Sequence, residues 1–223
     1  MIAAGRVTVN GQVATLGTRA DPEVDAIALD GAPVEIRLTD TTLALHKPVD
    51  YVVTASDEQG RPTVYDLLPE PPAGLRYAGR LDIDTSGLLL MSTDGELVHR
   101  LTHPRYHVAK TYEAYVEGVV SDRSIEMLRR GIDLEDGRTA PAEVERIGGT
   151  GRDTMLRLVI REGRNRQVRR MLETLGHRVM VLRRTAFGPI ELGGLAPGES
   201  RPLTPDEVAA LRVLVGLGDA ASA

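Results

Sequence analysis

The 223-residue sequence contains no cysteine and no tryptophan, and only one phenylalanine. The absence of cysteine excludes a disulfide scaffold, a thiolate zinc site and a thiol nucleophile. No apolar run reaches the roughly 18–20 residues that a membrane-spanning helix requires, and the N-terminal MIAAGRVTVNG lacks the apolar core of a signal peptide. We therefore expect a soluble, cytoplasmic protein, not a membrane or disulfide-rich secreted one.

Charge is distributed unevenly along the chain, although the net charge is only −5. Residues 161–184 hold eight arginines against Glu162 and Glu173, a local balance of +6, whereas residues 21–40 hold six acidic residues against one arginine. Phosphate binding depends on a local basic face more than on total charge. The sequence thus remains compatible with a nucleic-acid partner despite its acidic total.

The order of patterns predicts a small N-terminal module followed by a larger domain. Residues 1–38 alternate apolar and polar side chains, with turn signals at Asn10-Gly11 and Asp30-Gly31, as in short β-strands. A connection at 37–43 leads to a domain over 43–223, in which strands and helices mix without a strict β-α-β rhythm. The expected class is therefore α+β.

The segment GRLDIDTSGLLLMSTD, residues 79–94, places two carboxylates directly before a run of apolar residues. A carboxylate near an arginine such as Arg80 stays ionised and can serve as a nucleophile or base, a role that suits Asp82. Asp84, followed by Thr85-Ser86, is typical of a residue that organises a loop. Two alternatives stay open: Asp82 is an ordinary turn aspartate, or the two carboxylates form a glycosidase pair.

The segment EGRNRQVRRM, residues 162–171, predicts a basic helix with Arg166 and Arg170 on one face and an apolar stripe on another. Arginine's planar fork suits phosphate oxygens, and we expect Arg164, Arg166 and Arg170 to contact a phosphate backbone. The alternative is a solvated helix face with no ligand.

Two further patterns bear on chemistry. Lys110 and Tyr112 lie two residues apart on an expected strand and so share a face, where the tyrosine either stacks on a base or packs in the core. His99 and His103 have the i, i+4 spacing of metal ligands, but no third ligand is evident, so no metal site is predicted. The sequence has no glycine-rich phosphate loop, which removes support for a nucleotide cofactor.

The segment GRLDIDTSGLLLMST resembles the signature of the bacterial ribosomal-RNA pseudouridine synthases of the RsuA/RluB type. Three companion motifs resemble the family in the same order: HKP at 46–48, THPRYHVAKTYEAYVEG at 102–118 and REGRNRQVRRMLETLGH at 161–177. The N-terminal module is similar to the second half of an S4 RNA-binding domain. The resemblance implies a mixed, mainly antiparallel central sheet flanked by helices, with a catalytic cleft.

The resemblance also implies roles for individual residues. Asp82 corresponds to the catalytic aspartate, Tyr112 to the tyrosine that stacks on the target base, and Arg169 to the basic residue that forms an ion pair with the aspartate. Arg80 matches the arginine that helps hold the flipped-out site open. Lys110, which shares a strand face with Tyr112, is then expected to contact the substrate.

The implied reaction isomerises a uridine to pseudouridine without a metal or cofactor. The expected partner is ribosomal RNA, preferably of the large subunit, and the protein is expected to act as a monomer. The alternatives are small-subunit ribosomal RNA, or a non-catalytic RNA-binding or ribosome assembly protein.

Overall fold

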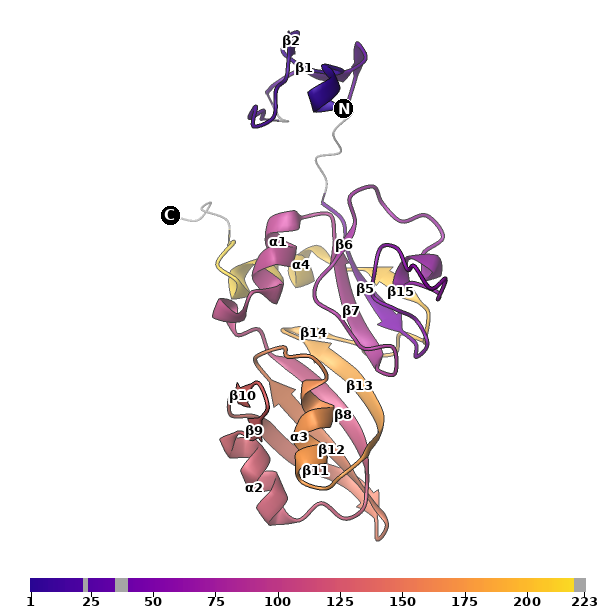
Figure 1. The fold of residues 1–223 in the computed structure, drawn as a ribbon, viewed down its shortest axis with the longest axis vertical. Coiled ribbons are helices and arrows are strands. Elements are labelled where there is room, and N and C mark those ends of the chain that lie inside the picture. Colours follow the sequence, from indigo (N-terminus) through magenta and orange to yellow (C-terminus); the bar gives the residue numbers. More distant parts are fainter. Residues whose placement is uncertain (22–23, 35–39, 219–223) are drawn as a thin grey trace. The chain divides into compact units, whose positions relative to one another are not determined.

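The structure is a computed structural model that describes residues 1–21, 24–34 and 40–218 (Figure 1). The chain divides into two units, residues 1–40 and 41–223. The predicted connection at 37–43 lies partly outside the described residues.

Short antiparallel hairpins build the first unit. Its strands are β1 (Val7–Val9), β2 (Gln12–Val13), β3 (Ile27–Leu29) and β4 (Ala32–Pro33), in the order β2-β1-β3-β4. Both predicted turns are confirmed: Asn10-Gly11 and Asp30-Gly31 have positive φ, as a two-residue type I′ hairpin requires. Ala14 is the one buried residue described in this unit, so hairpin geometry and surface polar contacts hold it more than a core does.

One large sheet organises the second unit. The strands are β5 (Thr42–Lys47), β6 (Arg76–Tyr77), β7 (Ser86–Ser92), β8 (Lys110–Glu117), β11 (Glu143–Thr150), β12 (Asp153–Ile160), β13 (Val179–Phe187), β14 (Ile190–Glu191) and β15 (Ser200–Pro202). Their order is β11-β12-β8-β13-β7-β5-β15, with β14 beside β13 and β6 beside β7. All pairings are antiparallel except that of β13 with β7, so the predicted mixed, mainly antiparallel sheet is confirmed.

Strand β7 is buried on both faces, which places it at the centre of the unit. Leu88 and Leu90 belong to one apolar cluster, whereas Leu89 and Met91 belong to the other. The first cluster includes residues of α1 (Gly95–Thr102) and α4 (Pro205–Leu214), and the second includes residues of α2 (Asp122–Arg130) and α3 (Gln167–Thr174). Because successive side chains of a strand point to opposite faces, helices cover both sides of the sheet, as Figure 1 shows.

Capping side chains mark the start of three helices. Asp94, Ser121 and Thr204 each accept a backbone N–H bond at the start of α1, α2 and α4. Gly176, just beyond α3, has a φ of +80°, which suits the chain reversal after a helix. Among the described residues, none of the helices has both the length and the apolar character that a membrane crossing requires.

Smaller elements complete the unit. A hairpin of β9 (Asp133–Leu134) and β10 (Gly137–Arg138) follows α2, and 3₁₀ turns lie at Val64–Leu67 and Pro104–Tyr106. Two-residue strands contain too few side chains to show an alternation, so their pairing is visible only in three dimensions.

The parallel contact between β13 and β7 joins the two parts of the sheet. It consists of two residue pairs, Arg183 with Ser86 and Arg184 with Gly87. The backbone of Arg184 comes so close to Gly87 that a Cβ atom there would lie 2.2 Å from the Arg184 carbonyl oxygen. Glycine is therefore required at the start of β7, immediately after the loop that carries both aspartates.

Candidate active site

The loop at residues 79–85 is fastened to the sheet by a buried lysine. Lys47, the last residue of β5, is fully buried, and its Nζ donates to the carbonyl oxygens of Pro48 (2.9 Å) and Thr85 (2.8 Å). Burial lowers the pKa of Lys47 to about 8, against the opposing charges of Asp82 and Asp84. The sequence contained this lysine within the HKP motif, but nothing in its spacing indicated that it supports the aspartate loop.

Asp84 is held by two arginines of the α3 region. Arg166 donates to both carboxylate oxygens of Asp84, at 3.1 and 3.0 Å, and Arg169 Nη2 donates to the Asp84 carbonyl at 2.7 Å. Partial burial alone would raise the pKa of Asp84, but the hydrogen bonds from Arg166 and the charges of both arginines outweigh it and lower that pKa. Asp84 therefore organises the loop, and its carboxylate is occupied.

The expected ion pair between Arg169 and Asp82 is not the arrangement observed. Arg169 Nε lies 3.4 Å from an oxygen of Asp84, and Arg166 is the arginine that approaches Asp82, at 4.0 Å. The reason is local: Arg166 precedes α3 in a left-handed conformation, with φ +48°, which aims its side chain at the loop. Arg169 lies one turn further along, buried, with its Nη1 bound to the carbonyl of Val179.

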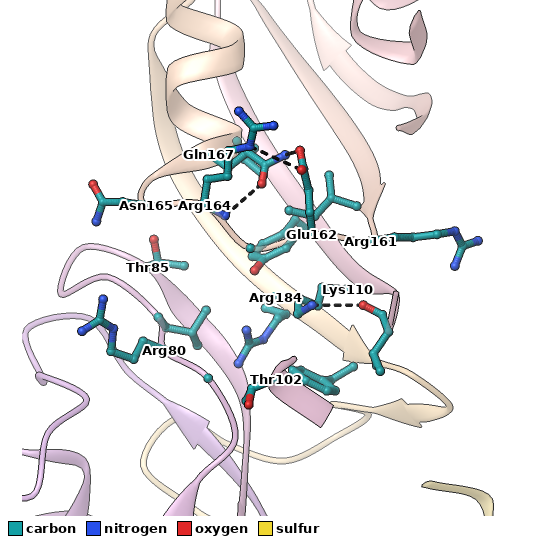
Figure 2. Close-up of a pocket in the computed structure, with 18 of the residues that line it drawn as sticks. Arg80, Thr85, Thr102, Lys110, Arg161, Glu162, Arg164, Asn165, Gln167 and Arg184 are labelled. Atoms are coloured by element: carbon teal, nitrogen blue, oxygen red, sulfur yellow. Dashed lines mark hydrogen bonds and ion pairs between the residues drawn. The ribbon is translucent and has the colours of Figure 1, made fainter. Parts of the chain in front are cut away.

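A cavity of about 290 Å³ opens beside this loop. Its lining comes from the aspartate loop, the end of α1, strand β8, the segment between β12 and α3, and strand β13 (Figure 2). The predicted site residues that line it are Arg80, Asp82, Lys110, Tyr112, Arg164 and Arg166. Arg169, Arg170 and Asp84 are not among the lining residues, so the structure separates the two aspartates.

Asp82 presents a free carboxylate to this cavity. Within the described residues its side chain accepts no hydrogen bond, and Arg166 at 4.0 Å is its nearest charged partner. The side chain is 30% exposed. The other acidic residue in the lining, Glu162, accepts bonds from Arg164, Gln167 and the Ala140 backbone. Asp82 is thus the lining carboxylate available to react.

Tyr112 and Lys110 share the face of β8 that borders the cavity, as the alternation predicted. Tyr112 is 8% exposed. Lys110 Nζ donates to the carbonyl of Val108 at 3.0 Å and lies 5.3 Å from the centre of the Phe187 ring. Burial, together with the nearby charge of Arg184, lowers the pKa of Lys110 to about 8.

Two of the arginines expected to bind phosphate are engaged within the protein. Arg164 donates to the carbonyls of Asp136, Gly137 and Arg138, which fastens the β9–β10 hairpin to the segment before α3. Arg170 binds both carboxylate oxygens of Asp136, each at 3.0 Å. These contacts give both side chains a structural role that a one-dimensional count of arginines cannot reveal.

One member of the histidine pair borders the cavity. The rings of His99 and His103 lie 5.4 Å apart, and His103 lines the cavity. In the part of the chain that the structure describes, no three His, Cys, Asp or Glu side chains are grouped as metal ligands would be.

Comparison with known proteins agrees with this geometry. The chain is 42% identical over 221 residues to the ribosomal large subunit pseudouridine synthase B of Bacillus subtilis (strain 168), covering 98% of this chain and 90% of that relative. It is 41% identical over 219 residues to an uncharacterised RNA pseudouridine synthase of Aquifex aeolicus (strain VF5), covering 97% and 88%.

A solved structure is also similar. The crystal structure of a pseudouridylate synthase superposes with a TM-score of 0.73 at 34% identity, over 94% of this chain and 90% of that one. Residues 41–174, which contain the aspartate loop, Tyr112 and α3, match the family described as RNA pseudouridylate synthase. With the fold, the motifs and the relatives in agreement, the chain belongs to the RNA pseudouridylate synthase family, whose members are isomerases.

Proposed function

We propose that this pseudouridine synthase converts one uridine of large-subunit ribosomal RNA to pseudouridine, with Asp82 as the catalytic carboxylate. The single observation that carries the proposal is the free carboxylate of Asp82 at a cavity that also presents Tyr112. The choice of RNA is supported by the Bacillus subtilis relative, which bears the name ribosomal large subunit pseudouridine synthase B.

The reaction has requirements that this inventory of side chains meets. The N1–C1′ bond of uridine breaks, the base turns, and a bond forms between C5 and C1′. The steps need a carboxylate that acts on the nucleoside, a pocket that holds the detached base, and removal of the proton at C5. Asp82 supplies the first, and the wall formed by Tyr112 and Leu182 supplies part of the second.

The dimensions of the cavity suit one extruded nucleoside. Its volume of about 290 Å³ lies just below the range of about 300–1,000 Å³ that is typical of ligand pockets. A target base must leave its helical stack to enter, at a cost of a few kcal/mol. Arg80, which makes no ion pair or hydrogen bond among the described residues, is the side chain that we assign to holding the opened RNA.

We assign the role of ion-pair partner of the catalytic carboxylate to Arg166, not to Arg169. Arg166 is the guanidinium within 4.0 Å of Asp82, and it also braces Asp84. We infer that Arg166 provides the positive charge beside Asp82 and that Arg169 fixes the loop backbone through the Asp84 carbonyl. The four-stranded N-terminal unit is proposed to be the S4-like module and to add RNA contacts.

A glycosidase pair gains no support from the structure. A pair of carboxylates must both face the substrate, whereas Asp84 is bound by Arg166 and does not line the cavity. Asp82 therefore acts in this proposal as a single carboxylate.

The test maps pseudouridines in ribosomal RNA from cells that lack the gene and are complemented with the wild type, with Asp82→Asn or with Asp133→Asn as an exposed control. We expect one large-subunit pseudouridine to disappear with Asp82→Asn alone, while the purified variant keeps its RNA affinity. A site lost from small-subunit RNA would redirect the substrate, and an unchanged map would overturn the proposal.

A further inference from the structure

Three cations that line the cavity have no carboxylate partner. Of the six lysines and arginines in its lining, Arg161, Arg164 and Arg166 form ion pairs with acidic side chains. Arg80, Lys110 and Arg184 form none within the described residues. Against these three charges stands the carboxylate of Asp82, so the cavity lining carries an excess of positive charge.

Arg184 is the most deeply buried of the three, at 1% exposure. Its Nε donates to the Leu88 carbonyl at 2.7 Å, but its Nη2 is buried without a hydrogen-bond partner. The hydroxyl of Thr85, also in the cavity lining, is likewise buried and unpartnered. A buried donor left unpaired costs stability, and two such atoms at one cavity indicate that a polar ligand completes them.

Lys110 and Arg184 both lie close to the ring of Phe187. The Lys110 nitrogen lies 5.3 Å and the Arg184 guanidinium carbon 5.1 Å from the centre of the Phe187 ring. The face of an aromatic ring offers partial compensation to a buried cation. It supplies no hydrogen-bond acceptor, however, so both groups remain able to bind an anionic oxygen.

Both residues line the cavity from the paired strands β8 and β13. Arg184 pairs with Tyr112 across β8 and β13, and Phe187 pairs with Lys110. Figure 2 shows Arg184 and Lys110 side by side, with Thr85 and Arg80 on the neighbouring loop. Arg184 is therefore the immediate neighbour of the tyrosine to which base stacking is assigned.

We propose that Arg184 and Lys110 form a cationic floor that binds the oxygen atoms of the target uracil and stabilises the negative charge of the base during its transfer. This inference rests on the proposed function and deepens it by assigning a site for the base. Arg184 is accordingly a catalytic residue that the sequence motifs had not indicated.

The charge follows from the electron balance of the isomerisation. When the N1–C1′ bond breaks, its electron pair leaves with the base, and the resulting anion is delocalised over the ring and both carbonyl oxygens. The loss of that electron pair leaves C1′ of the sugar electron-deficient. This deficiency is compensated either by a bond from Asp82 to C1′ or by loss of the C2′ proton. When C5 bonds to C1′, the Asp82–C1′ bond breaks and its electron pair returns to the carboxylate, or, on the other route, C2′ regains its proton. The C5 proton is then lost and N1 gains a proton, so no atoms or electrons are gained overall.

A base oxygen fits this floor better than a phosphate does. Phosphates stay with the ribose chain outside the stack, whereas the extruded base enters deepest. Arg184 is almost fully buried beside Tyr112, whereas Arg80, on the loop, is exposed and suits the RNA backbone. Fixed donors aimed at developing charge in such a site contribute about 10²–10³-fold in rate each.

The test uses the full-length protein and the rRNA fragment that the wild type modifies, prepared with uridine or with an abasic ribose at the target position. We compare Arg184→Met, Arg184→Lys and Lys110→Met with the wild type and with Asp82→Asn. Single-turnover rates and RNA dissociation constants are measured for each protein, and circular dichroism and thermal melting establish that it is folded.

We expect Arg184→Met to slow single turnover about 100-fold or more, with affinity for the abasic RNA within twofold of wild type and partial recovery in Arg184→Lys. Equal weakening toward uridine and abasic RNA would show a phosphate contact and overturn the proposal. So would a wild-type rate in Lys110→Met, a variant that keeps the Arg184–Leu88 bond should Arg184→Met fail to fold. A failure of the proposed function itself would be seen separately, as an active Asp82→Asn or an inactive wild type.

Discussion

Arg166 binds both carboxylate oxygens of Asp84, yet approaches Asp82 only to 4.0 Å. The same guanidinium therefore leaves the two carboxylates in different environments. The carboxylate of Asp84 is hydrogen-bonded on both oxygens, whereas that of Asp82 accepts no hydrogen bond among the described residues. The division is made by α3, which is distant in sequence from the aspartate loop.

Substitution of the two aspartates should therefore have unequal effects. Asp82→Asn is expected to reduce single turnover by at least about 10³-fold without lowering the melting temperature. Asp84→Asn should retain measurable turnover but lose about 1 kcal/mol of stability, since the half-exposed pair with Arg166 is weakened. Chemical denaturation of Asp84→Asn, Arg166→Ala and the double variant measures this coupling, and full additivity would contradict it.

Arg80 and Arg170 should contribute unequally to RNA binding, because, of the two, only Arg170 is paired among the described residues. Arg80→Gln is expected to weaken RNA affinity and to reduce the slope of log K against log salt by about 1, because an unpaired cation at the cavity is lost. Arg170→Gln, the matched control, breaks the pair with Asp136 and should leave that slope unchanged. Filter binding from about 50 to about 300 mM salt decides between them. A reduced slope in Arg170→Gln would contradict the assignment.

Stability should depend on pH through Lys110. Burial lowers its pKa to about 8 in the folded protein, whereas in the unfolded chain it titrates near 10.4. Between these values the unfolded state binds more protons, so the unfolding free energy gains a contribution that grows with pH.

Lys110→Met removes that contribution. At pH 7 the variant should be more stable than the wild type, by on the order of 1–2 kcal/mol, and the difference should shrink between about pH 8 and 10.5. Urea denaturation across this range provides the measurement. A stability difference that is constant with pH would show that the lysine is not buried as a cation.

Gly87 should tolerate no side chain. A Cβ atom would collide with the Arg184 backbone at 2.2 Å, and the φ of +112° is itself unfavourable for other residues. We expect Gly87→Ala to destabilise the protein by about 3 kcal/mol or more. Gly151→Ala, where a Cβ would meet open space, is the control and should melt near the wild-type temperature.

The sequence predicted elements wherever local signals were strong. The caps at Asp94, Ser121 and Thr204 and the apolar run at 88–91 each specify their structure within a few residues. Asp82, Tyr112 and Lys110 were identified from motif and alternation, and all three line one cavity.

What escaped prediction depends on contacts between distant segments. Whether an arginine binds RNA or a carbonyl of its own chain is set by what lies opposite, as the β9–β10 hairpin does for Arg164. Lys47 and Arg184 likewise looked like ordinary strand residues. Their burial at the cavity follows from the order of strands in the sheet, which no spacing within one segment encodes.

The two-pair parallel contact between β13 and β7 has a consequence for how the enzyme can be divided. Asp82 belongs to the β7 side of that contact, and Tyr112, Lys110 and Arg184 belong to the β8–β13 side. Neither side by itself holds a complete set of reacting groups, so fragments cut between α1 and β8 should be inactive alone and recover turnover only on reassembly. This two-pair contact therefore sets the position of Asp82 relative to Tyr112, Lys110 and Arg184. Turnover measures whether the two portions of the sheet are correctly joined.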